Sequence, residues 1–209
     1  MYLQLSPKFR KENQLHLKTD TLVHEAPWQH FILDNVFALN DFINLQERIL
    51  SQNHEFKIGS EDPEQIQLRA LPDMALAEAL LSEEFQGLLE KVSGSALSIY
   101  KSGALQLRRM TPDSPAFPPH YDFIDHRTLV MLYYLGRDWT PANGGELLLH
   151  KEEGAAIDGP DTKWISPIAN RMVLFFCDET NWHSVRQVIN WNRYLVFAEW
   201  SVVSNERIL

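Results

Sequence analysis

The chain has one cysteine, Cys177, among its 209 residues, so it cannot form an internal disulfide, and this fits a reducing compartment. It contains no apolar run approaching the roughly eighteen residues of a membrane span. The N-terminus carries Lys8, Arg10 and Lys11 and lacks the apolar core of a signal peptide. These absences predict a cytoplasmic protein with no membrane partner.

The chain is also poor in positive charge. Its 19 lysines and arginines are outnumbered by 28 aspartates and glutamates, which gives a net charge of −9. Non-specific binding of nucleic acid needs a basic surface, so we expect no nucleic-acid partner. Glycine-rich nucleotide loops and the Cys/His clusters of zinc sites are missing from the sequence. Cys177 follows Phe175 and Phe176, which favours a buried, inert thiol over a nucleophile.

No repeat, low-complexity segment or linker divides the chain, and we predict a single domain over residues 1–209. The first part, about 1–100, is expected to be a helical support region. Within it, residues 1–27 are polar and irregular, and residues 51–72 read as a long loop. A short strand is expected at 30–33.

Three helices are expected in the same region. One begins near Asn40, a good N-cap, and carries Phe42, Leu45 and Ile49 on one face. Another begins near Asp73. The third is capped by Ser82 and ends at Gly94, with an apolar stripe between them.

The second part, about 101–204, has short apolar segments separated by turn signals and shows no helical periodicity. Residues 128–135, 147–149, 171–176, 183–189 and 193–203 each suit a buried strand. This organisation predicts a mainly β fold, a sandwich or jelly roll, in which strands distant in sequence can lie side by side.

His120-Tyr121-Asp122 and the distant His183 form the most informative pattern. A His-x-Asp pattern alone is weak, because about one chain in two or three of this kind contains it by chance. Here it follows Pro118-Pro119, which cannot lie in a central strand, and it precedes a buried strand. Two histidines and one carboxylate on one side of a metal form the facial triad of non-haem Fe(II) oxygenases.

Residues 120–200 resemble the Fe(II)- and 2-oxoglutarate-dependent dioxygenases, and within them the prolyl-4-hydroxylase-like branch with a double-stranded β-helix (jelly-roll) core. The matching residues are His120-x-Asp122, Leu132-Tyr-Tyr-Leu135 with Asp138-Trp139, Gly144-Gly145-x-Leu147, Arg171-x-x-Leu174-Phe175-Phe176 with Asp178, His183-x-Val185 and Arg193-Tyr194. The hypoxia-sensing members carry a further tyrosine on the strand before the His-x-Asp loop, where this chain has Arg109-Met110.

The resemblance implies a role for each matching position. His120, Asp122 and His183 would bind Fe(II), and Arg193 with Tyr134 would bind the distal carboxylate of 2-oxoglutarate. Arginine suits that task because its planar fork makes two parallel bonds to a carboxylate. Two apolar residues, Leu147 and Val185, would line the co-substrate pocket, and Arg127 would lie near the substrate mouth. O2 would be the oxidant, with ascorbate as a candidate reductant.

The implied activity is hydroxylation of an unactivated C–H bond, with release of succinate and CO2. Asp122 favours hydroxylation, because related halogenases have a small residue there that leaves room for chloride. Two other classes stay open: a non-catalytic jelly-roll metal-binding module, and a cupin-like iron protein that uses no 2-oxoglutarate. The substrate is either a protein prolyl residue or a small molecule, and the residues do not decide between them.

Overall fold

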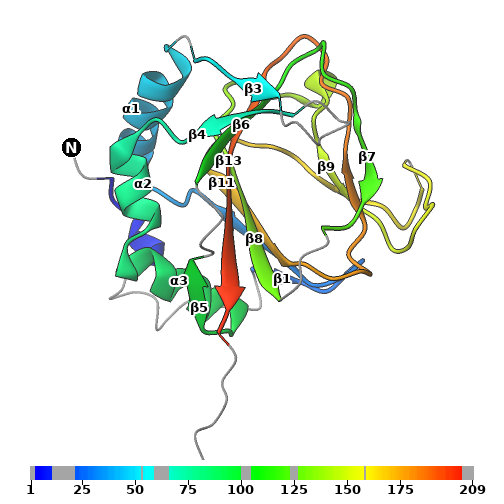
Figure 1. Cartoon of the computed structure of the whole chain (residues 1–209), viewed down its shortest axis with the longest axis horizontal. Coiled ribbons are helices and arrows are strands. Elements are labelled where there is room, and N and C mark those ends of the chain that lie inside the picture. Colours follow the sequence, from blue (N-terminus) through cyan, green and yellow to red (C-terminus); the bar gives the residue numbers. More distant parts are fainter. Residues whose placement is uncertain are drawn as a thin grey trace, which may run out of the picture.

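Two antiparallel β-sheets face each other, and helices cover the outer side of the larger sheet, as Figure 1 shows. The structure is a computed structural model that describes residues 3–10, 22–52, 54–58, 66–99, 105–122, 127–157 and 159–203. It is a mainly β jelly roll with N-terminal helices, as the sequence predicts.

The larger sheet brings together strands from both halves of the chain. Its spatial order is β1 (Val23–His24), β2 (His30–Asp34), β11 (Arg171–Phe176), β8 (Thr128–Tyr134), β13 (Arg193–Val202), β6 (Gln106–Met110), β4 (Gln67–Ala70) and β3 (Lys57–Ile58), with β5 (Leu97–Ile99) also paired to β13. The smaller sheet has the order β10 (Lys163–Ile165), β9 (Leu147–Leu149), β12 (His183–Val185) and β7 (Phe117–His120).

The helical layer consists of α1 (Leu39–Leu50), α2 (Met74–Leu80) and α3 (Glu83–Ser93), with short 3-10 turns η1 (Pro7–Phe9) and η4 (Pro141–Asn143) elsewhere. The side chains of Asp73 and Ser82 cap α2 and α3 by accepting bonds from Leu76 and Phe85 backbone N–H groups. Gly94 ends α3 with a φ of 67°, a conformation that glycine adopts without strain. Among the described residues, no helix has the length and apolar character needed to cross a membrane.

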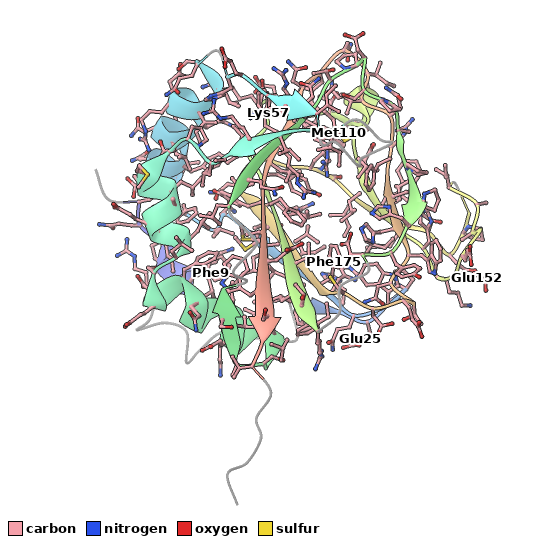
Figure 2. The ribbon with its side chains drawn as sticks, viewed as in Figure 1. Phe9, Glu25, Lys57, Met110, Glu152 and Phe175 are labelled. Carbon is pink, nitrogen blue, oxygen red and sulfur yellow. The ribbon has the colours of Figure 1, made fainter. Side chains whose placement is uncertain are left out.

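Strand alternation divides the interior into two cores. Tyr133 points towards the helices, where Phe42 of α1 packs against it, whereas its neighbour Tyr134 points into the space between the sheets. Full burial of an apolar side chain of this size stabilises a fold by about 1.5–3 kcal/mol, so both cores contribute. Figure 2 shows Phe175 and Met110 in the inter-sheet core and Phe9 on the helix side.

Most of the predicted elements are confirmed, namely the strand at 30–33, the buried face of α1, and the helices from Asp73 and Ser82. Asn40 is not the N-cap of α1, however. Ala38 holds that position, and its methyl side chain cannot accept a capping bond; Asp41 in the first turn accepts from the Gln4 backbone N–H.

Two further predictions about the first hundred residues are wrong. The predicted loop 51–72 contains β3 and β4, which are only two and four residues long and form because β3 pairs with β4 and β4 pairs with β6. The start of the chain is not merely irregular either, because Leu5 and Phe9 are buried in the helix-side core. Residues 11–21 lie outside the described residues.

Candidate metal and 2-oxo acid site

The two histidines of the predicted triad face each other across two strands of the smaller sheet. His120 ends β7, His183 begins β12, and they are direct partners in the antiparallel register. Their ring centroids are 4.2 Å apart. The register shifts between His183 and Val185, at the level of Pro118-Pro119, because prolines cannot donate to the ladder. The local irregularity brings both rings to the same end of the inter-sheet space.

Each imidazole is oriented by the backbone in the same way. The Nδ1 atom of His120 lies 2.9 Å from the carbonyl oxygen of Pro118, and that of His183 lies 2.9 Å from the carbonyl of Asn181. A carbonyl oxygen only accepts, so Nδ1 carries the hydrogen in both rings. The lone pair is therefore on Nε2, the atom that can bind a metal, and a hydrogen bond of this kind fixes ring orientation in metal sites.

Asp122 completes the group. Its carboxylate oxygens lie 3.8 Å from Nε2 of His120 and 3.7 Å from Nε2 of His183. One ligand atom from each of the three residues lies within 4.8 Å of the others, so one ion can contact all three. The His183 side chain is 7% exposed and the Asp122 side chain 27%, so the group is open towards solvent on the Asp122 side. Two imidazoles and one carboxylate on one side of an ion suit Fe(II) with open positions.

Two aromatic side chains pack on the His183 ring. Trp28 and Phe175 contact its ring edge-on or tilted, with centroid separations of 6.5 and 5.0 Å. Trp28 is itself held by a 3.0 Å bond from its Nε1 to the carbonyl oxygen of His150. This contact joins residues 122 positions apart, and no local pattern around Pro27-Trp28 signals it.

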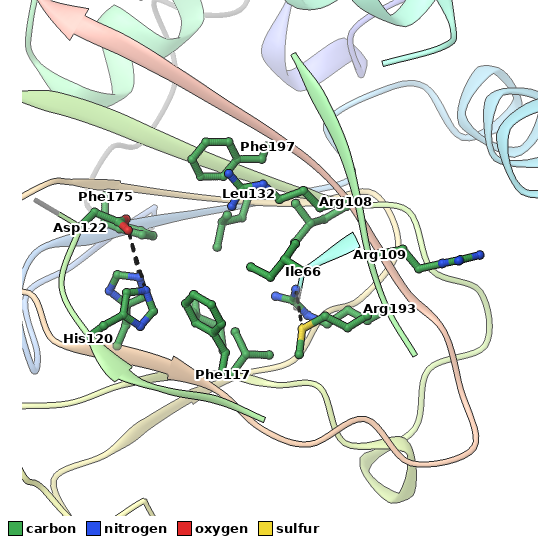
Figure 3. A pocket seen from close by; sticks show the side chains of 15 residues that line it. Ile66, Arg108, Arg109, Phe117, His120, Asp122, Leu132, Phe175, Arg193 and Phe197 are labelled. Atoms are coloured by element: carbon green, nitrogen blue, oxygen red, sulfur yellow. Dashed lines mark hydrogen bonds and ion pairs between the residues drawn. The ribbon is translucent and has the colours of Figure 1, made fainter. Parts of the chain in front are cut away.

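A pocket extends from the triad between the sheets and encloses about 580 Å³ of space that is partly open to solvent. Figure 3 shows His120 and Asp122 at one end and Arg193 at the other, with Phe117 and Leu132 between them. The lining also includes Ile66, Arg108, Arg109, Met110, Leu147, Phe175, His183, Val185, Leu195 and Phe197. Most of these side chains are apolar, which limits water around any polar group in the pocket.

Arg193 is a buried cation at the far end of this pocket, only 4% exposed. Its Nε donates to the carbonyl oxygen of Gly145 at 2.9 Å, and its Nη2 donates to the Tyr134 hydroxyl at 3.2 Å. Met110 is its register partner on β6, with the sulfur 3.9 Å from Nη1. Within the described parts of the chain, Arg193 has no carboxylate partner. A buried cation without a counter-charge is costly, and an anionic ligand would remove that cost.

Tyr134 is fully buried beside this cation. Burial raises the pKa of the Tyr134 hydroxyl, and the nearby Arg193 guanidinium opposes part of that rise. The hydroxyl therefore stays protonated at neutral pH. Since its oxygen accepts from Arg193, its own O–H can donate to an acceptor bound at Arg193.

The Gly144-Gly145 pair makes room for the arginine. Both residues have positive φ, 68° and 79°, and a Cβ on Gly145 would lie 3.2 Å from Cδ of Arg193. A side chain there would push against the aliphatic part of Arg193 and strain the backbone as well. Gly145 thus allows the arginine to lie against the backbone.

The remaining predicted residues divide between the pocket and its surroundings. Leu147 and Val185 line the pocket. Arg127 is exposed, and its guanidinium lies 4.1 Å from the ring centroid of Phe176. It is not among the residues that line the pocket, and its role in substrate binding stays a prediction. Cys177 is partly buried, and burial raises the pKa of its thiol, as suits an unreactive cysteine.

Residues 105–201 match the sequence model of the 2OG-Fe(II) oxygenase superfamily. Among functionally curated proteins, no sequence matches the chain significantly.

Solved structures share the fold. A prolyl hydroxylase from Trichoplax adhaerens, solved with a hypoxia inducible factor peptide fragment, aligns with a TM-score of 0.63 at 20% identity, covering 85% of each chain. A prolyl-4-hydroxylase from Pseudomonas putida gives 0.62 at 17% identity, covering 83% of this chain and 91% of the other. HygX from Streptomyces hygroscopicus, solved with nickel, 2-oxoglutarate and hygromycin B, gives 0.59 at 13% identity, covering 84% and 83%.

The fold and the triad fit a mononuclear metal site in a jelly-roll core. The family match covers every residue of the triad and also Arg193, so residues 105–201 are similar in sequence to the 2OG-Fe(II) oxygenase superfamily. Structural neighbours of the chain include prolyl 4-hydroxylases. The family and the triad together imply Fe(II) and 2-oxoglutarate.

Proposed function

We propose that this chain is a 2-oxoglutarate-dependent hydroxylase that inserts one oxygen atom into an unactivated C–H bond. The observation that carries the proposal is Arg193, a buried cation without a carboxylate partner in the described structure, in the same pocket as the His120, Asp122 and His183 group. A metal-binding module or a cupin-like iron protein needs no such anchor. A 2-oxo diacid would use both ends of the pocket at once.

Each residue has a defined task in this proposal. His120, Asp122 and His183 hold the ion from one side, and the carbonyls of Pro118 and Asn181 keep both Nε2 atoms directed at it. When bound, iron with 2-oxoglutarate supplies the chemistry in which O2, the 2-oxo acid and a substrate C–H bond become succinate, CO2 and an alcohol.

Arg193 and Tyr134 bind the distal carboxylate of the co-substrate. The arginine offers two edge N–H groups in a plane, which pair with both oxygens of a carboxylate, and the tyrosine adds a neutral donor. The apolar residues Leu147 and Val185 cover the carbon chain between the two ends. Their packing excludes water, which strengthens the charged contacts.

Asp122 supports hydroxylation over halogen transfer. Its carboxylate lies at similar distances from both histidine Nε2 atoms, so it would serve as the third ligand at the position that the related halogenases leave to chloride. With that position filled by a carboxylate, the product expected is an alcohol.

The test uses the purified chain with Fe(II) and ascorbate. Anaerobic calorimetry should detect one 2-oxoglutarate bound per chain only when metal is present. Exposure to labelled O2 should then give succinate carrying one labelled oxygen atom, slowly without substrate and faster with one. A chain that binds Fe(II) but neither binds 2-oxoglutarate nor forms succinate would refute the proposal and favour the non-catalytic module.

A further inference from the structure

His150 is a fully buried histidine that lies next to the metal group without belonging to it. It follows β9, whose last residue, Leu149, is the register partner of His183 on β12. His150 is not among the described residues that line the pocket, and its ring nitrogens are not part of the group that can share one ion. Any role of His150 at the metal must therefore pass through His183.

Three hydrogen bonds of His150 reach three residues that adjoin His183. Its backbone N–H donates to the carbonyl oxygen of Trp182 at 2.8 Å. Its own carbonyl oxygen accepts from Nε1 of Trp28 at 3.0 Å, and the Trp28 ring packs edge-on against that of His183. Its ring Nε2 lies 2.7 Å from Oγ of Ser184. Since Trp182 and Ser184 flank His183 in the chain, one residue holds the neighbours of a metal ligand both in sequence and in space.

The hydrogen bonds of the His150 ring have a defined direction. Burial lowers the pKa of His150, and the nearby His183 acts in the same direction, so the ring is neutral at neutral pH. Oγ1 of Thr162 donates to the carbonyl oxygen of Ala156 at 2.9 Å, so it accepts in its 3.3 Å contact with Nδ1 of His150. Nδ1 therefore carries the hydrogen, and Nε2 accepts from the Ser184 hydroxyl. Because both ring nitrogens are bonded, the orientation of the ring is fixed.

The bond to Ser184 acts on the metal ligand through the short strand β12. Ser184 and His183 are consecutive in this strand, so their side chains point to opposite faces of the smaller sheet. His183 faces the pocket, and Ser184 is buried on the other face. One bond of His150 thus holds the residue after the ligand, and the bond to Trp182 holds the residue before it. With only three residues in β12, these two bonds restrict how the backbone of His183 can turn.

Trp28 is the contact that acts on the ring of His183 itself. It comes from the chain before β2, and its side chain is almost fully buried. The bond from its Nε1 to the His150 carbonyl sets where the indole lies against His183. That carbonyl is at the point where the backbone leaves β9, and the His150 ring anchors this point through Ser184. A change of the ring therefore affects the position of Trp28 as well.

We infer that His150 is a positioning residue for the metal ligand His183. Its ring and backbone hold Ser184, Trp182 and Trp28, which keep the His183 imidazole directed at the metal position. The inference rests on the metal group of the proposed function and is independent of the reaction that the bound metal supports.

The test measures binding of Co(II), which takes the same kinds of ligand as Fe(II) and whose visible absorption reports the geometry of those ligands. His150→Phe keeps a ring and removes both of its hydrogen bonds. Ser184→Ala removes the shared bond from the other side at the loss of one oxygen atom, and it tests the inference even if the phenylalanine variant does not fold. His150→Gln is the conservative variant, because its side-chain oxygen can accept from Ser184.

His54→Phe is the matched control. His54 is also buried, and both nitrogens of its ring are bonded, one to the carbonyl oxygen of Ile49 and the other to Arg69. It belongs neither to the pocket lining nor to the metal group. Urea unfolding of the metal-free variants measures how much stability each substitution costs, so that a loss of stability can be separated from a loss of metal binding.

His150→Phe should bind Co(II) about ten- to a hundredfold more weakly than wild type, the range for a residue that orients a metal ligand, with a changed absorption spectrum. Ser184→Ala should change both in the same direction. The double variant should bind no more weakly than His150→Phe alone, because the two substitutions break one bond. His150→Gln should recover part of the affinity, and His54→Phe should keep the affinity and spectrum of wild type.

Wild-type affinity and spectrum in His150→Phe, or in Ser184→Ala if the former does not fold, would overturn the positioning role. An equal loss of affinity in His54→Phe would also overturn it, since the effect would then follow stability alone. Failure of the hydroxylase proposal is a different result, in which wild type binds metal but neither binds 2-oxoglutarate nor forms succinate. A wild-type chain that bound no Co(II) would refute the metal group, and both proposals with it.

Discussion

His120 and His183 are direct cross-strand partners on β7 and β12, and each ring donates from Nδ1 to the carbonyl oxygen two residues before it. Both histidines of the metal group are therefore oriented by the same kind of backbone hydrogen bond. Neither ring can rotate without losing a backbone hydrogen bond, so the Nε2 atoms are directed at a common point before any ion arrives. Such preorganisation lowers the cost of binding a metal.

We predict that His183→Ala lowers Fe(II) affinity by more than about a hundredfold, since loss of even a residue that only orients a ligand costs ten- to a hundredfold. Metal titration followed by calorimetry measures the change. His24→Ala is the control, because His24 stacks on His30 away from the triad. Equal metal affinity in wild type and His183→Ala would contradict the triad.

Arg193→Leu is expected to weaken 2-oxoglutarate binding by about thirty- to several-thousand-fold, the range for losing one partner of a buried charged pair. Metal affinity should be nearly unchanged, because Arg193 is not part of the triad. Tyr134→Phe removes one neutral donor and should cost about 0.5–3 kcal/mol. Calorimetry with the metal-loaded variants checks both. If Arg193→Leu bound 2-oxoglutarate as wild type does, the anchor would have to be another residue.

Gly145→Ala should destabilise the fold by about 1–2 kcal/mol through its positive φ, and it should also weaken 2-oxoglutarate binding by displacing Arg193. Gly154→Ala is the matched control. Its φ of 74° is similar, but a Cβ there meets nothing within 4 Å. Urea unfolding and calorimetry of both variants separate backbone strain from the contact with Arg193. Similar 2-oxoglutarate affinities in the two variants would show that the contact between Gly145 and Arg193 does not position the arginine.

His30 should make the protein less stable in mild acid. Burial lowers the pKa of His30, and although the bond to the Trp28 carbonyl opposes this, its Nε2 is buried without a partner in the described structure. The unfolded chain takes up a proton near pH 6.5, where the folded chain does not, so this contribution to stability is present above that pH and lost as pH falls.

Urea unfolding of wild type and His30→Phe at pH 8 and pH 5.5 tests this. The substitution removes the bond to Trp28 at both pH values, so only the change with pH reports the titration. Wild type should lose more stability between the two conditions than His30→Phe. Equal losses would show that His30 does not titrate on unfolding.

Much of the local structure could be predicted because its signals are local. Ser82 and Gly94 bracket α3 as a cap and a left-handed terminator do in any helix, and the apolar run 128–134 formed the central strand β8. The first predicted N-cap, Asn40, was wrong by two positions, since helix ends depend on nearby tertiary bonds such as that from Gln4 to Asp41. The strands β3 and β4 are only two and four residues long, and they form because β4 pairs with β6 and β3 pairs with β4.

The candidate site, too, could be predicted only in part from the sequence. The sequence by itself determined which residue types could bind a metal and a carboxylate, because His120, Asp122, His183 and Arg193 carry that chemistry in a recognisable order. Its single cysteine also underlies the expected cytoplasmic location, which stays a prediction. Only the tertiary structure decided that Trp28 packs on His183, and that Arg108 stacks on Phe197 while its neighbour Arg109 lies over Phe56. Which face a side chain takes depends on register, and register is set by strands far away in the chain.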